Sequence, residues 1–374
     1  MARLNIIGFE TGQAGDSEVE DTNVPSVVTS PVRSGAYAGR GEFRCYGLAA
    51  TGQAGADFNV ATLYAGFFLH ITAFPATDRA LIAVEQTTLA DKATIRINTD
   101  GTLSLLDSAS AVVGTSSAVL NVNQWHHIAF KIPTSASPAN GELWINQIQA
   151  VSANGSFGAA NNAAIECFAG TGGFTPTYDD LIFDDAAIPA PNFVSALEPN
   201  GTFANTNWTD EGGAAGSYTK VSERPHDSDT TYVKTSTNTS VFGVDYSEPE
   251  VKKIIGPIYT VKGWANCRDT GTSLSFKIGL NWNGTVTELT AADGGGSYTA
   301  VPPANSNRFI LRTTNSSGGT ITPTDLKTLR TIVTHSQSQA RELRCTAMGL
   351  FVEHASPFAG KLVVNQAVNR ASTY

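Results

Sequence analysis

Four aspartates near the end of one predicted strand form the densest carboxylate group in the chain. They are Asp179, Asp180, Asp184 and Asp185, and they follow or interrupt an alternating apolar stretch. Carboxylate oxygens are hard ligands that suit calcium, so Asp179, Asp180 and Asp184 are candidate metal ligands. Regular alternation would place Asp180 and Asp184 on one strand face and Asp179 and Asp185 on the other. The simpler alternative is that these carboxylates solvate the end of a strand.

Histidines and a polar loop offer two further candidate sites. His126 and His127 are adjacent, and neighbours in a strand point to opposite faces, so the two rings cannot bind one ion. We therefore predict structural roles for both. His226, Asp227 and Asp229 lie together after a proline. Because Asp side chains readily bond nearby backbone amides, a turn is favoured there over a metal site.

The composition limits the class of protein. The chain has 374 residues, of which 41% are hydrophobic and 15% charged, and its formal net charge is -9. The hydrophobic share excludes a disordered chain, and the acidity argues against nucleic acid or an anionic membrane as partner. No apolar run approaches the roughly 20 residues of a membrane helix. The first residues lack the apolar stretch of a secretory signal peptide, so we expect synthesis without export by that route.

Strand patterns dominate the chain. Period-two alternation recurs between Gly, Pro, Asn and Asp clusters, and Asn98–Gly101 carries an Asp-Gly hairpin signal. One short helix is predicted from about Pro323 to Thr334, with Thr322 as its cap and Asp325 completing a capping box. The predicted fold class is therefore all-β, with two tandem β-sandwich (jelly-roll-like) domains and one short helix in the second.

Two prolines in Ile188–Asn192 break the strand pattern and indicate a domain boundary. We expect one β-sandwich over residues 1–190, a second over 191–355, and a C-terminal arm or tail over 356–374. That segment either adds a strand to a neighbouring subunit or is a frayed end. Residues 1–190 hold 8 basic and 18 acidic side chains, whereas 191–374 hold 16 and 15. The acidity thus belongs to the first half.

The four cysteines are widely spaced, which excludes a zinc knuckle or a redox CxxC motif. They are Cys45, Cys167, Cys267 and Cys345. Each lies in an alternating stretch, which favours buried free thiols. One disulfide in each half, Cys45–Cys167 and Cys267–Cys345, is the alternative in an oxidising medium.

Residues 1–190 resemble a laminin-G-like, concanavalin-A-type jelly roll. The likeness is carried by four parts of the sequence: Ile7–Gly12, Arg33–Arg40, the hairpin of Asn123–Phe130 with Gly141–Asn146, and Tyr178–Phe183. Gln147 stands where this family's hairpin has glycine. The resemblance implies a tryptophan–histidine strand in the core, and some relatives bind calcium near the closing strand.

Concanavalin-type folds include enzymes that cleave glycans with two carboxylates across the scissile bond. The laminarinase-like members carry an E-x-D-x-x-E strand motif, which is absent because no glutamate here has an aspartate two positions later. The chain also has no Gly-x-Ser-x-Gly elbow, His-Glu-x-x-His motif, phosphate loop or dinucleotide fingerprint. We predict that it is not an enzyme. Aromatic rings that could stack on sugars are candidates for binding: Trp208, Trp264, Trp282 and Tyr298.

The second half is similar to a domain of structural proteins in tailed bacteriophages. The matching stretches are Pro199–Gly201, Trp208–Thr209, Asp227–Val233, Thr322–Leu326 and Met348–Glu353. The resemblance implies a non-enzymatic virion structural protein, assembled in the host cytoplasm. It would decorate the capsid exterior or attach to the tail, through contacts with major capsid or tail proteins and with copies of itself. The alternative is a carbohydrate-binding, lectin-like module of a tail fibre or tail tip that recognises host-surface glycan. No cofactor is expected, and calcium is the one candidate.

Overall fold

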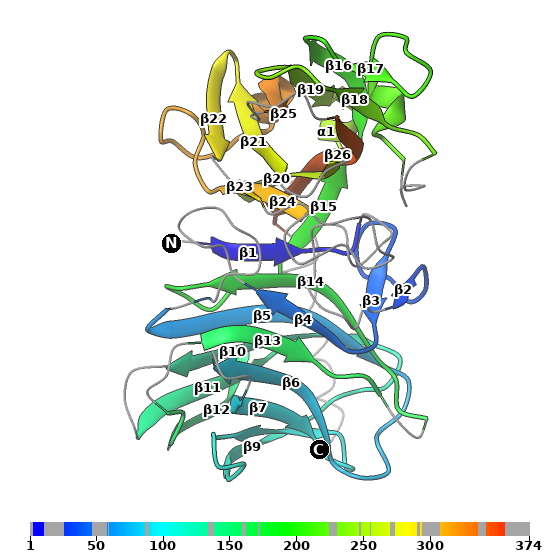
Figure 1. Ribbon diagram of the computed structural model, residues 1–374. Helices are drawn as coiled ribbons and strands as arrows, with labels where there is room; N and C mark the ends of the chain where they lie inside the picture. Colours follow the sequence, from blue (N-terminus) through cyan, green and yellow to red (C-terminus); the bar gives the residue numbers. More distant parts are fainter. Residues whose placement is uncertain are drawn as a thin grey trace.

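The computed structural model describes residues 3–10, 26–46, 58, 60–86, 90–133, 138–158, 162–170, 173–223, 230–246, 248–254, 256–269, 274–289, 292–293, 307–335 and 342–355. Within these residues the chain forms four antiparallel sheets, arranged as two stacked bodies (Figure 1). The predicted all-β class with β-sandwich-like domains is confirmed.

The lower body in Figure 1 contains an eight-stranded and a six-stranded sheet. The eight-stranded sheet has the order β12-β11-β10-β5-β14-β3-β2, with β1 also paired to β14; its strands are β1 Arg3–Ile7, β2 Ser26–Val28, β3 Ala38–Arg40, β5 Thr62–Ile71, β10 Trp125–Pro133, β11 Ala139–Ile145, β12 Ile148–Gly155 and β14 Pro176–Asp184. The six-stranded sheet has the order β4-β13-β6-β7-β8-β9; its strands are β4 Phe43–Tyr46, β6 Arg79–Gln86, β7 Asp91–Ile97, β8 Thr102–Leu106, β9 Val112–Val119 and β13 Asn162–Cys167. Alternate residues of both sheets, such as Phe130 and Leu105, meet in one apolar core.

The upper body is built from two six-stranded sheets. The first follows the order β17-β18-β26-β20-β24, with β15 on β26; its strands are β15 Phe193–Leu197, β17 Thr209–Asp210, β18 Val233–Thr235, β20 Ile258–Asp269, β24 Asn307–Arg312 and β26 Leu343–His354. The second follows β16-β19-β25-β21-β22, with β23 on β21; its strands are β16 Pro199–Asn205, β19 Val241–Tyr246, β21 Leu274–Trp282, β22 Thr285–Leu289, β23 Ala292–Asp293 and β25 Leu329–His335. Their facing side chains, including Leu350 and Ile278, form a second core.

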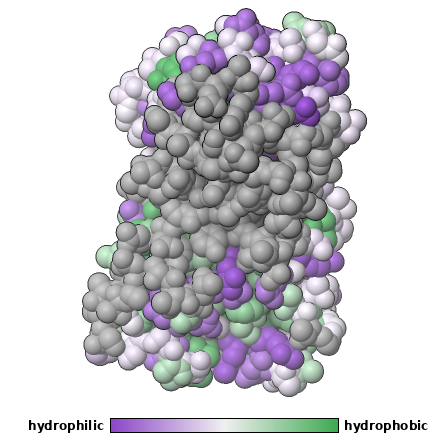
Figure 2. Space-filling view, in the orientation of Figure 1, coloured by the Kyte–Doolittle hydropathy of each residue, from purple (hydrophilic) through white to green (hydrophobic). Residues whose placement is uncertain are grey.

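The sequence ranges of the two bodies do not interleave. Strands β1–β14 build the lower body and β15–β26 the upper one, and β14 ends at Asp184 before β15 begins at Phe193. The domain limits at 190 and 355 remain predictions, and residues 356–374 lie outside the described part. On the face seen in Figure 2, the described residues of the upper body are coloured mostly white to purple, with few green side chains.

Two local predictions meet different outcomes. The Asn98–Gly101 turn is confirmed: it joins β7 to β8, and Gly101 takes a positive φ of 82°, which glycine adopts without strain. The helix is shorter than predicted, because α2 spans only Pro323–Thr328 and β25 follows directly. The predicted capping box between Thr322 and Asp325 is present. Two further single turns are α1 Glu248–Val251 and η1 Tyr218–Lys220.

Candidate functional site

The three candidate metal ligands lie on β14 and are almost completely buried, at 0%, 1% and 0% exposure for Asp179, Asp180 and Asp184. The pairing of β14 with β5 shifts register between Asp179 and Ile182, and Asp180 has a positive φ of 48°. Such a bulge interrupts the alternation of side chains. Asp179 and Asp180 therefore both bond the Arg33–Ser34 segment instead of pointing to opposite faces, and the regular alternation that we expected does not hold.

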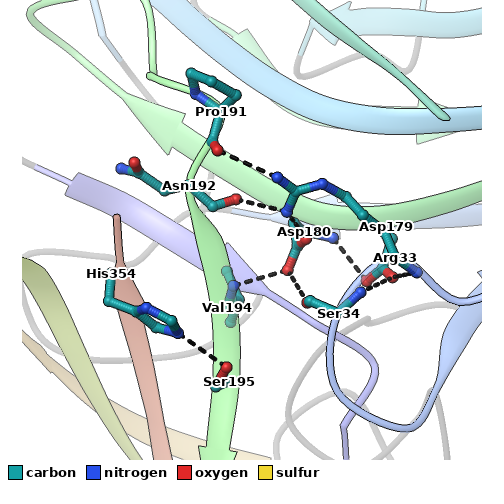
Figure 3. Close-up of polar contacts among 9 residues, drawn as sticks. All are labelled: Arg33, Ser34, Asp179, Asp180, Pro191, Asn192, Val194, Ser195 and His354. Carbon is teal, nitrogen blue, oxygen red and sulfur yellow. Dashed lines mark hydrogen bonds and ion pairs between the residues drawn. The ribbon is translucent and has the colours of Figure 1, made fainter. Parts of the chain in front are cut away.

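Protein donors bind both of these carboxylates (Figure 3). Asp180 pairs with the Arg33 guanidinium and also accepts hydrogen bonds from Ser34 Oγ and the Val194 amide, each at 2.7 Å. Asp179 accepts from the backbone amide of Arg33 at 3.0 Å and from that of Asp180 at 2.9 Å. Val194 belongs to β15, so Asp180 ties the upper body to the lower one.

Arg33 is the centre of this arrangement. Its side chain is 7% exposed and donates to the carbonyls of Asn192 at 3.1 Å and Pro191 at 3.2 Å. Its guanidinium carbon lies 3.2 Å from the centroid of the Phe68 ring and 4.0 Å from that of Phe193. A planar cation stacked between two rings and bonded along its edges uses most of what arginine offers. Arg33 therefore fixes the segment between the two bodies.

A second buried ionic group lies beside it. Arg3 on β1 pairs with Asp184 and donates to both carboxylate oxygens of Glu353 on β26, at 2.8 Å each. Glu353 also accepts from the side-chain amide of Asn192 at 2.7 Å. Asp184 in turn accepts from two backbone amides that follow it, those of residues 186 and 187. Each carboxylate thus has a cationic partner and at least one further donor.

Packing between the bodies completes this junction. An apolar cluster joins residues of β1, β14 and β15 to residues of β20 and β26: Ile6, Ile182, Val194, Trp264, Ala347 and Phe351. Beside it the fully buried Lys262 ammonium donates to Asn5 Oδ1 at 3.1 Å and to the Ile6 carbonyl at 3.0 Å. Part of the outer face of one sheet of each body is therefore buried against the other body.

Burial and neighbouring charges shift the pKa values of several of these groups. Burial, followed by the nearby Asp180 charge, raises the pKa of Asp179 well above its ordinary value. Burial opposes the charge of Arg3, yet Glu353 and Asp184 together raise its pKa. Burial lowers the pKa of Arg33. The junction is consequently a set of mutually neutralising charges that depend on one another.

Asp179, Asp180 and Asp184 fit a calcium site poorly. Calcium takes six to eight oxygen ligands, and here the oxygens of Asp179, Asp180 and Asp184 already accept bonds from arginines, a hydroxyl and amides. A bound cation would have to displace Arg33 or Arg3. Calcium at these residues stays a prediction from the sequence, and no step of the function is built on it.

The two adjacent histidines occupy separate environments. His126 Nε2 lies 3.0 Å from the Asn121 carbonyl oxygen, and its Nδ1 lies 3.2 Å from the Asn146 amide nitrogen. His127 is 2% exposed and its ring lies 5.0 Å from that of Phe68. Burial, with the Arg33 charge adding to it, lowers the pKa of His127 to about 3. Both rings belong to the packed structure, as predicted, and His226, Asp227 and Asp229 lie outside the described residues.

The tryptophans proposed for sugar stacking are buried. Trp208, Trp264 and Trp282 are between 1% and 3% exposed, and Tyr298 lies outside the described part. Two other tryptophans, Trp125 and Trp144, are half-buried. The sequence predicted a core position for the strand that holds Trp125. Alternation alone does not show which face of a strand is covered, so it could not reveal that Trp125 is half-buried.

An acidic group that the sequence did not reveal lies on the six-stranded sheet of the lower body. Carboxylate oxygens of Glu85, Asp91 and Glu166 approach within 4.8 Å of one another. Arg44 bridges Glu85 at 2.9 Å and Glu166 at 3.0 Å. Burial, and then the charge of Glu85, raise the pKa of Glu166 to about 7. Glu85 and Asp91 lie on the consecutive strands β6 and β7, but Glu166 lies on β13, far along the chain, so no sequence motif indicated the group.

The cysteines are buried and carry free thiols in this structure. Cys267 and Cys345 are direct cross-strand partners, and Cys45 lies on β4 beside Cys167 on β13. Burial raises the pKa of Cys167 and of Cys267 well above the usual thiol value, and the neighbouring thiol adds to each rise. Their unreactive, protonated form suits small apolar core residues. The adjacency leaves the alternative pairing, Cys45–Cys167 and Cys267–Cys345, open.

Comparison with known proteins gives only distant structural likeness. The chain matches no known family and no curated protein. Among solved structures, Trypanosoma rangeli sialidase is 9% identical over 50% of this chain and 31% of its own, with a TM-score of 0.35. Domain 4 of a GH43 extracellular arabinanase from Geobacillus stearothermophilus, solved with arabinotriose, is 13% identical over 50% and 94%, with a TM-score of 0.34. The carbohydrate-binding module CBM66 of Bacillus subtilis is 12% identical over 43% and 91%, with a TM-score of 0.28.

This chain spans about a third of the sialidase that it resembles. Likeness at this level carries no statement about architecture or activity. Among the described residues, no helix has both the length and the apolar character needed to cross a membrane.

Proposed function

We propose that this chain is a non-enzymatic structural component of a bacteriophage virion that works through protein–protein contacts. It would decorate the capsid exterior or attach to the tail. The observation that carries the proposal is the junction of Arg3, Arg33, Asp184 and Glu353, which buries charges and apolar side chains between the two bodies. Domains joined by a small polar interface move freely, whereas this junction holds two sandwiches in one orientation. A part of a symmetric particle needs such a fixed shape.

Two features of the sequence support this proposal. The first half resembles a laminin-G-like jelly roll and the second half a domain of tailed-phage structural proteins, an order that suits a virion protein. The near-neutral second half also contrasts in charge with the acidic first half. Virion parts are symmetric, and closed oligomers are the common solution to symmetry. We therefore propose self-association, as trimers or another cyclic form, together with docking on capsid or tail proteins.

The deciding experiment is the position of the protein on intact particles, traced by cryo-electron microscopy at side-chain resolution. Density on the capsid surface at symmetric positions supports decoration, and density on the tail supports the tail assignment. Particles that contain the protein in neither place, or a purified chain that hydrolyses glycans, would overturn the structural role.

A second candidate function is recognition of a host-surface glycan by the first domain, as a tail-fibre or tail-tip module. It is favoured by one specific observation: the half-buried Trp125 on β10 is paired with His70 of β5 on the outer face of the eight-stranded sheet. A purified chain that binds no glycan on an array would remove this candidate and leave the structural role untouched.

A further inference from the structure

Four residues form a straight row across the outer face of the eight-stranded sheet of the lower body. Arg40 on β3 pairs with Thr177 on β14, Thr177 pairs with His70 on β5, and His70 pairs with Trp125 on β10. Directly paired residues of antiparallel strands share a face. Tyr178, the neighbour of Thr177 along β14, points into the core. The row therefore lies on the opposite, outer face.

Arg40 differs from the other arginines around it. In residues 1–190, where acidic side chains outnumber basic ones 18 to 8, most basic side chains have a carboxylate partner: Arg3, Arg33, Arg44, Arg96 and Lys131. Within the described residues, half-buried Arg40 makes one bond, from Nε to Thr177 Oγ1 at 3.3 Å. Guanidinium carries five N–H donors in a planar fork that matches a carboxylate. Most of that fork has no hydrogen-bond partner among the described residues.

His70, in the same row, also has a polar atom without a hydrogen-bond partner among the described residues. His70 is 8% exposed, and its Nδ1 is buried without a hydrogen-bond partner in the described part of the chain. Buried polar atoms normally have a partner, so such an atom indicates a missing water or ligand. The His70 ring lies 5.3 Å from the ring of Trp125, which is half-buried and so presents part of its surface. An unused cation, an unsatisfied nitrogen and an aromatic ring thus stand side by side.

We propose that the row Arg40–Thr177–His70–Trp125 binds a carboxylate-bearing saccharide. Arg40 takes the carboxylate and Trp125 packs against the apolar C–H face of the sugar ring, while His70 bonds a sugar hydroxyl. Thr177 is only 1% exposed, so it positions Arg40 through its hydroxyl and does not touch the ligand. Sites with a few polar groups beside aromatic surface suit such a mixed ligand. An acidic peptide fits less well, because extended peptides add to a free sheet edge and this row crosses interior strands.

This inference deepens the glycan-binding candidate and does not depend on the virion role. The full-length chain is applied to an array of glycans that end in uronic or sialic acids, each printed beside its neutral counterpart. The tightest ligand is then titrated by calorimetry against the wild type, Arg40→Gln and Trp125→Ala. We expect preference for acidic glycans and a loss of about tenfold or more in affinity for each variant.

Matched controls separate the site from general damage. Arg79→Gln removes an exposed arginine from the other sheet, and Trp144→Ala removes the second half-buried tryptophan on the same outer face. Both should bind as the wild type does, and all variants should keep its melting temperature within a few degrees. Arg40→Lys, which keeps the charge without the fork, should bind between the wild type and Arg40→Gln.

Three results would overturn the inference. The first is absence of binding to every acidic glycan at about 1 mM, and the second is equal binding by the wild type and both site variants. The third is binding of a tetraglutamate peptide in preference to all glycans, which would assign the row to protein recognition. None of them changes the expected position on virions, so this failure and that of the structural role can be told apart.

Discussion

Arg33 combines more interactions than any other residue that we describe at the junction. It stacks between Phe68 and Phe193, pairs with Asp180 and donates to two carbonyl oxygens of the linking segment. Lysine has neither the planar fork nor the stacking surface. The geometry therefore makes this one position specific for arginine.

Replacement of Arg33 by lysine should be costly despite the retained charge. We expect Arg33→Lys to lower the free energy of unfolding by about 2 kcal/mol or more, because the carbonyl partners and the ring contacts are lost in a buried site. Urea titration monitored by fluorescence measures this. The exposed Arg79→Lys should change stability by less than about 0.5 kcal/mol, and equal effects of the two would refute the role of Arg33.

Glu166 should make the stability of the protein depend on pH. Its pKa is about 7 in the folded protein against about 4.3 in an unfolded chain, so the folded state binds more protons between these values. Stability from this group is then present at low pH and declines as the pH rises toward 7. Glu166→Gln should remove that decline and stabilise the protein at pH 8 by about 1 kcal/mol. Thermal melts at pH 5 and pH 8 test it, and a larger gain at pH 5 contradicts it.

At the scale of elements, the segment after Thr322 begins as a helix set by local residues and continues as a strand set by tertiary pairing. The capping box and Pro323 begin a helix as predicted. The helix ends at Thr328 because the next residues include β-branched Thr331, Ile332, Val333 and Thr334, which favour strands. As β25 they pair with both β19 and β21. Leu329 and Val333 belong to the core as residues of this strand.

The cap itself can be tested. Thr322 accepts a hydrogen bond from the Asp325 amide, and Asp325 accepts one from the Thr322 amide at 2.8 Å. Thr322→Ala should lower stability by about 1 kcal/mol. Thr324→Ala, an exposed change within the same helix, serves as the control and should be neutral or slightly stabilising. If both variants melted at the wild-type temperature, α2 would have no measurable capping energy.

At the scale of the whole molecule, the junction couples two sandwiches that each have a core of their own. Glu353 on β26 bonds Arg3 of β1 and Asn192 of the connection, so it joins the last described strand to the first. Removing one member of a buried ionic group leaves its partner uncompensated, which costs about 3 to 5 kcal/mol. The two bodies should therefore unfold together in the wild type.

Calorimetry can detect that coupling. We expect one cooperative transition for the wild type, with equal calorimetric and van't Hoff enthalpies, and two separated transitions for Glu353→Ala. Glu342→Ala removes a more exposed glutamate paired with Lys234 and Arg344 in the same body, and should shift the transition slightly without splitting it. Two transitions in the wild type would show that the junction does not couple the bodies.

The sequence by itself determined the all-β class, the Asn98–Gly101 hairpin and the start of α2, because each depends on alternation or on residues a few positions apart. It also identified Asp179, Asp180 and Asp184 as unusual, but not what they do. Only the tertiary structure decided that a bulge turns Asp179 and Asp180 toward one segment, and that Arg33, Arg3 and Glu353 meet them. The row from Arg40 to Trp125 and the cluster of Glu85 and Glu166 were likewise hidden. Strand pairing brings together residues separated by long stretches of chain, and no local pattern encodes which strands will be neighbours.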